Sequence, residues 1–188
     1  MLSDAPISPS EITQGTLLDK VTWPQEPENP PLGIVLSNPC DLEHGKASYM
    51  LVSPLLDASV VVRQTKEWHS IVGLNDGPLS KSKQDKLRKL LGKYIHNIEA
   101  NRRHFCIRAT ELQIGVDLLM VDFQNLHSLP IESRETVEPL AQLESPYREQ
   151  MMMHFVSYVA RIGVDRVDGG ELTRIKHSLA GEYLSPAP

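Results

Sequence analysis

The side chains best suited to chemistry lie in a turn that directly follows a short apolar run, residues 33–36. The turn combines a hydroxyl, an amide, a thiol and a carboxylate, at Ser37, Asn38, Cys40 and Asp41. A cysteine nucleophile needs a depressed pKa and a nearby base. Asp41 would raise the pKa of the thiol, and His44 has no fixed geometry in a loop. We therefore expect Asn38 and Asp41 to hydrogen-bond the turn backbone, with Cys40 pointing inward, and keep all four residues as catalytic candidates.

Two cysteines and two histidines have the ligand types of a tetrahedral zinc site. They are Cys40, His44, His104 and Cys106. Positions 104 and 106 would face the same side of a strand, yet neither pair has the spacing of a zinc finger. Cys106 also stands between Phe105 and Ile107, as a core residue would. The sequence therefore favours no metal and no other cofactor, and zinc is an alternative that metal analysis would decide.

Positive charge is concentrated between residues 81 and 103. Eight basic residues stand there against Asp85 and Glu99, a net charge of +6, so that the rest of this −5 chain carries −11. The eight are Lys81, Lys83, Lys86, Arg88, Lys89, Lys93, Arg102 and Arg103. Such a segment can contact phosphates, dock on an acidic protein, or form the solvated face of a helix. Aromatic side chains that would stack on bases are scarce nearby.

Three successive methionines, Met151, Met152 and Met153, lie in a segment with helical periodicity. Successive residues of a helix are about 100° apart, so the three cannot all face one core. We expect at least one of them to lie on a second apolar surface. That surface is either packing between two layers or, because methionine suits adaptable contacts, an interface with a partner or a second copy.

Hydrophobic patterning predicts the elements that position these residues. Strands are expected over 16–23, 33–36, 47–52, 105–107, 116–123 and 126–131, with Ser53-Pro54 ending the third; helices are expected over 65–72, 80–97 and 145–162, with a weaker one over 170–179. Residues 60–62 suit a short strand or the start of a helix. Four prolines make residues 24–31 a loop. This order of strands and helices predicts an α+β fold.

Composition narrows the class of protein. With 40% hydrophobic but only 5% aromatic residues, the core must be mainly aliphatic. No apolar stretch approaches the roughly 20 residues of a membrane helix, and the first residues lack the pattern of a secretory signal. Two cysteines do not make a disulfide framework. These features predict a cytoplasmic protein that does not contact membranes.

Three segments in the first 56 residues resemble the MazF/PemK family of plasmid-maintenance toxins. They are 15–18 (GTLL), 31–38 (PLGIVLSN) and 50–55 (MLVSPL). The resemblance implies a small, SH3-like antiparallel β-barrel. That family cleaves RNA with an arginine ahead of the second segment and a threonine after the third. Pro30 or Pro31 and Ser53 or Pro54 stand at those places here, which counts against the same catalysis.

Together these observations predict an α+β protein with an SH3-like barrel over 11–135. An amphipathic basic helix would be inserted at about 65–100 and a helical cap would span 140–182, between a flexible N-terminus (1–10) and a tail (183–188). The predicted function is a non-enzymatic adaptor that binds a protein partner or a second copy, and also RNA or DNA. The resemblance points to a toxin–antitoxin or phage-defence setting. The alternative is a divergent, metal-independent endoribonuclease built on the turn.

Overall fold

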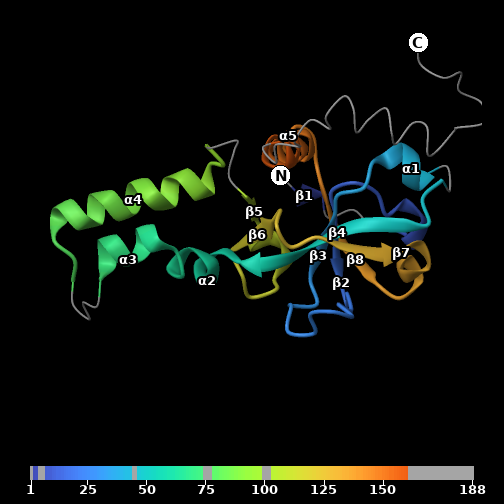
Figure 1. The fold of residues 1–188 in the computed structure, drawn as a ribbon, viewed down its shortest axis with the longest axis horizontal. Coiled ribbons are helices and arrows are strands. Elements are labelled where there is room, and N and C mark those ends of the chain that lie inside the picture. Colours follow the sequence, from blue (N-terminus) through green and yellow to red (C-terminus); the bar gives the residue numbers. More distant parts are fainter. Residues whose placement is uncertain (1, 4–6, 44–45, 74–77, 99–102, 161–188) are drawn as a thin grey trace, which may run out of the picture.

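The computed structural model describes residues 2–3, 7–43, 46–73, 78–98 and 103–160. Its eight strands form one antiparallel sheet in the order β1-β8-β2-β3-β4-β6-β5, with β7 paired to β4. The strands are β1 (Leu2–Ser3), β2 (Thr16–Asp19), β3 (Gly33–Val35), β4 (Tyr49–Asp57), β5 (His104–Arg108), β6 (Leu118–Asp122), β7 (His127–Pro130) and β8 (Glu138–Leu143). The sheet curls into a half-barrel, as Figure 1 shows, and the α+β class is confirmed.

Five α-helices accompany the sheet in the described part of the chain. They are α1 (Pro39–Glu43), α2 (Ala58–Arg63), α3 (Lys66–Val72), α4 (Lys81–Ile95) and α5 (Tyr147–Val159), with short 3-10 turns at Pro9–Glu11, Thr110–Leu112 and Ile131–Glu135. The expected helix over 170–179 lies outside the described residues. None of the helices that the structure describes has the length and apolar character needed to cross a bilayer.

Both faces of the sheet are buried, and since successive strand residues point to opposite sides, neighbouring residues join different clusters. Leu17 and Ile34 pack in one cluster with Met151 of α5, whereas their neighbours Leu18 and Val35 pack in a second cluster on the other face. The second cluster is filled by Trp23, and Gly33 makes room for it. A Cβ added at Gly33 would lie 3.1 Å from the Trp23 ring and 3.0 Å from a methyl of Val52.

Strand β4 continues through Pro54, so the expectation that Ser53-Pro54 ends this strand is wrong. The neighbouring residues Ser53 and Leu55 take their backbone partners from the β3 side, where the Leu55 N–H donates to the Leu32 carbonyl at 2.9 Å. Pro54 has no backbone N–H, and the missing donor would have pointed to the opposite edge of β4. There, β4 changes partners, from β7 at Val52 to β6 at Leu55, so the missing N–H falls in a gap of the ladder.

The sheet also extends beyond the barrel limits of 11 and 135 that the sequence predicts. Strand β8 reaches into the region assigned to the helical cap and pairs with β2, matching Leu17 to Ala141. Strand β1 lies in the region assigned to a flexible N-terminus and pairs with β8, matching Leu2 to Leu143. Strand β2 ends at Asp19, earlier than expected, because Lys20 adopts a positive φ of 58°.

After β4 the chain leaves the sheet, forms helices α2 to α4 and returns to the sheet at β5. Residues 58–73 and 78–98 are called the arm below. Figure 1 shows α3 and α4 side by side, extending away from the sheet. Residues 60–62 belong to helix α2, whose Val62 packs with Leu90 and Tyr94 of α4. Cys106 of β5 and Met120 of β6 complete this cluster. A small apolar core of its own therefore attaches the arm to the sheet.

Candidate functional site

In the turn after β3, two of the four catalytic candidates satisfy the backbone. The Ser37 Oγ accepts a hydrogen bond from the Leu51 N–H at 2.7 Å. The Asn38 Oδ1 accepts one from the Cys40 N–H at 3.0 Å, at the start of α1. Both side chains therefore hold the chain where β3 passes into α1.

Cys40 is exposed, so the expectation that it points inward is wrong. The turn continues as helix α1, and it is Leu42, 3% exposed, that faces the core. Asp41 is exposed beside Cys40. The thiol and the carboxylate thus lie next to each other at the surface of a five-residue helix.

The four zinc candidates do not form a site in the part of the chain that the structure describes. Cys106 is buried in the core of the arm's base, and His104 lies two residues before it on β5, 6.4 Å from the Tyr94 ring. His44 lies outside the described residues. Among those described, no group of three or more histidine, cysteine, aspartate or glutamate side chains is placed to hold a metal ion.

Arg103, predicted as a nucleic-acid or partner contact, has partners within the protein. Its guanidinium donates to the buried Asp122 carboxylate at 2.6 Å, to the Gln124 Oε1 at 2.7 Å and to the His104 Nε2 at 2.8 Å. Arg103 therefore clamps one end of the β5–β6 pair. Arg102 lies outside the described residues.

The six other predicted basic contacts lie on α4. Lys83 is half-buried and the other five are exposed, namely Lys81, Lys86, Arg88, Lys89 and Lys93. Arg88 pairs with Asp85 at 3.0 Å. Lys86, Lys89 and Lys93 follow one another at i, i+3 and i+7, so they form one row along the helix; this row is called the lysine stripe below.

The three methionines of α5 have different surroundings, as the helical period requires. Met151 is fully buried against the sheet, Met152 is half-buried, and Met153 is 69% exposed. Val156 and Val159 are also exposed, at 59% and 40%. The expectation that the three cannot share one core is confirmed, and Met153 with the two valines forms an apolar area on the outer side of α5.

A pocket of about 410 Å³ lies at the base of the arm. It is lined by the end of β4, helices α2, α3 and α4, and the segment that leads into β6: Asp57, Ala58, Ser59, Val62, Arg63, Trp68, Leu91, Tyr94, Ile95, Gly115, Val116, Asp117 and Leu118. The volume is in the range of sites that hold organic ligands or large side chains. We call this the arm-base pocket.

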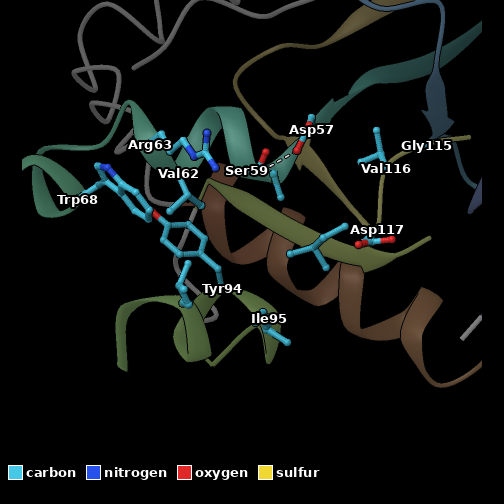
Figure 2. A pocket seen from close by; sticks show the side chains of 13 residues that line it. Asp57, Ser59, Val62, Arg63, Trp68, Tyr94, Ile95, Gly115, Val116 and Asp117 are labelled. Atoms are coloured by element: carbon cyan, nitrogen blue, oxygen red, sulfur yellow. Dashed lines mark hydrogen bonds between the residues drawn. The ribbon is translucent and has the colours of Figure 1, made fainter. Parts of the chain in front are cut away.

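Figure 2 shows how the side chains around the arm-base pocket are distributed. Trp68 and Tyr94 come from α3 and α4 and lie near Val62, whereas Val116 and Asp117 lie at the other end. The Arg63 guanidinium is 6.0 Å from the centre of the Trp68 ring, within range of a cation–π interaction. The Asp57 carboxylate accepts the Ser59 N–H at 2.7 Å and caps α2. The walls of the arm-base pocket are apolar, and the charged side chains of Asp57, Arg63 and Asp117 lie around them.

Sequence analysis did not find this pocket. Its members come from four separate stretches of the chain, within 57–63, at 68, within 91–95 and at 115–118, and no spacing rule connects Trp68 with Val116. The available signal was Trp68 itself, a large aromatic in a helix too short to bury it alone.

Comparison with profiles of known protein families and with curated protein sequences found no match for this chain. The resemblance to the MazF/PemK toxins therefore stays a prediction.

Proposed function

We propose that the protein is a non-enzymatic binding subunit whose arm contacts the phosphate backbone of a nucleic acid. The lysine stripe is the observation that carries this proposal. At about 100° per residue, Lys86, Lys89 and Lys93 lie on the flank of α4 opposite Leu91 and Ile95, which line the arm-base pocket. The stripe thus lies away from the part of the pocket wall that Leu91 and Ile95 form, on a helix that extends from the sheet (Figure 1).

The charge of the arm supports the same proposal. Residues 58–98 carry eight basic side chains against Glu67, Asp76 and Asp85, a net charge of +5 in a chain of net charge −5. Lysines that neutralise phosphates release condensed counterions, and this release drives binding. Backbone contacts carry no sequence information, and aromatic side chains that would stack on bases are absent from the lysine stripe itself. We therefore expect sequence-independent binding to a duplex.

The test is fluorescence anisotropy with labelled DNA and RNA duplexes at about 50 to 200 mM salt. Binding should weaken as salt rises, and the slope of log K against log salt should be about −0.9 for each phosphate contact. The Lys86→Gln/Lys89→Gln variant should make the slope shallower by about 1.8, since it loses two such contacts.

A matched control removes the same charge elsewhere. Lys20 and Lys46 are exposed and lie outside the arm, so Lys20→Gln/Lys46→Gln should leave the slope unchanged. The proposal is wrong if the wild-type protein does not bind either duplex at low salt. It is equally wrong if the two double variants weaken binding to the same extent.

The endoribonuclease alternative places catalysis at Ser37, Asn38, Cys40 and Asp41. The two hydrogen bonds that Ser37 and Asn38 accept from the backbone count against it, because those groups already serve the turn. Incubation with single-stranded RNA followed by a denaturing gel distinguishes the two functions. Fragments that disappear in Asp41→Ala would replace the binding proposal with the enzymatic one.

We also propose a narrower fold class and a biological setting for the protein. The short sequence resemblance and the curled antiparallel sheet together support an SH3-like barrel as the origin of this half-barrel. A toxin–antitoxin or phage-defence setting and a cytoplasmic location rest on the sequence alone and stay predictions.

A further inference from the structure

We infer that the arm-base pocket holds a segment of a partner protein, one that presents a large apolar side chain next to a lysine or arginine. With the lysine stripe on the opposite flank of α4, this would make the protein a bridge between a nucleic acid and a second protein. The inference concerns a different surface from the proposed function and does not depend on it.

The walls of the pocket select an apolar side chain. Trp68, Val62, Leu91, Tyr94 and Leu118 line it, and hydrophobic side chains gain free energy in proportion to the apolar area that they remove from water. Three of these five residues also pack against the small core of the arm's base without being fully buried themselves. The pocket is thus a gap in an apolar core that an incoming side chain would complete.

The charges around the pocket select a cation beside that apolar group. Two carboxylates, Asp57 and Asp117, stand against one guanidinium, Arg63. Arg63 lies over the Trp68 ring, whereas Asp117 lies at the opposite end (Figure 2). A lysine or arginine placed beside Asp117 would therefore meet a carboxylate and not a positive charge.

Exposed apolar residues next to the pocket favour a polypeptide over a free small molecule. Ile95 lines the pocket and is 43% exposed, and Ile98, three residues further on, is 65% exposed. Interfaces between proteins combine one anchored side chain with such a surrounding surface, whereas a ligand enclosed in the pocket would leave these residues in water.

The experiment uses three capped hexapeptides as probes, identical except at two central positions that read Leu-Lys, Leu-Glu or Ala-Lys. Each is titrated into the full-length protein labelled with ¹⁵N. The chain has two tryptophans, so two indole N–H signals are expected, and Trp68→Phe assigns them. The Leu-Lys peptide should shift the Trp68 signal and leave that of the buried Trp23 in place.

The remaining probes and two variants test each part of the inference. The Leu-Glu peptide should bind more weakly than the Leu-Lys peptide, by about threefold or more, and the Ala-Lys peptide should not bind. Asp117→Asn should remove the preference for lysine over glutamate. Asp41→Asn, the same change on exposed α1, should preserve it. Lys86→Gln/Lys89→Gln should bind the peptide normally, which separates this result from the nucleic-acid test.

Three outcomes would overturn the inference. The first is a Trp68 signal that does not move at millimolar Leu-Lys peptide. The second is equal affinity for the Leu-Lys and Leu-Glu peptides. The third is a Trp68 signal that moves with protein concentration alone, which would make a second copy of this chain the occupant of the pocket.

Discussion

The side-chain amide of Asn97 pairs with both backbone groups of Cys106. Its Nδ2 donates to the Cys106 carbonyl at 2.9 Å, and its Oδ1 accepts the Cys106 N–H at 2.8 Å. Asn97 follows α4 and adopts a positive φ of 50°, a conformation that asparagine tolerates better than most residues. One side chain thus substitutes for a neighbouring strand at the outer edge of β5 and fastens the end of the arm to the sheet.

This pairing predicts a large loss of stability for Asn97→Ala. The substitution leaves two buried backbone groups without partners, at a cost of about 1–3 kcal/mol each, and places alanine at an unfavourable φ. Asn97→Gly avoids only the penalty of the positive φ, so most of the loss of stability should persist. Urea unfolding measures both values. A loss below about 1 kcal/mol in Asn97→Ala would mean that the amide does not hold the arm.

The Arg103–Asp122 clamp predicts that Arg103 serves stability and not nucleic-acid binding. Asp122 has a side chain 8% exposed, and that of Arg103 is 45% exposed. Arg103→Gln leaves the carboxylate without its ionic partner and should lower the free energy of unfolding by about 1–3 kcal/mol. The salt slope of duplex binding should not change at a temperature where the variant is folded. A slope that falls by about 0.9 would instead assign Arg103 to a phosphate.

The two cysteines should react at very different rates. Cys40 is exposed and Cys106 is 1% exposed in the core, so a thiol reagent should modify one cysteine in the native protein and both in urea. Cys40→Ser should abolish the native reaction, and Cys106→Ala should leave it intact. Native protection of Cys40 would contradict its placement on the surface of α1.

His154 should make the protein less stable in mild acid. It is 4% exposed on α5, its ring meets that of Phe105 edge-on at 5.3 Å, and its Nδ1 has no hydrogen-bond partner among the described residues. Burial lowers the pKa of His154 below its ordinary value of 6.5. The unfolded chain therefore takes up the proton first, so stability is full above pH 6.5 and declines as the pH falls below that value.

His154→Phe tests this dependence. Phenylalanine cannot be protonated and fits an apolar site, so the part of the acid-dependent loss that begins below the ordinary histidine pKa should disappear. Denaturant unfolding at a series of pH values measures it, with His69→Phe on the exposed surface of α3 as the control. An unchanged pH profile in His154→Phe would assign the acid sensitivity to other groups.

Much of the local structure was determined by the sequence itself. The apolar period of 80–97 predicted helix α4, and the Ser80 Oγ accepts the Lys83 N–H at its start. The strand over 33–36, the helix over 65–72 and the division of the three methionines between core and surface were also predicted. Each of these depends on periodicity or capping within a few neighbouring residues, which a single sequence displays directly.

Only the tertiary structure decided which segments meet. Strand β8 has the sequence EPLAQL, which shows no strand pattern, and it forms because β2, some 120 residues earlier, offers a free edge. Cys40 faces solvent because Leu42 occupies the inward position, and Arg103 is engaged because β6 brings Asp122 beside it. The arm-base pocket needs β4, three helices and the approach to β6 together. Such contacts join residues far apart in the chain, and no local pattern encodes them.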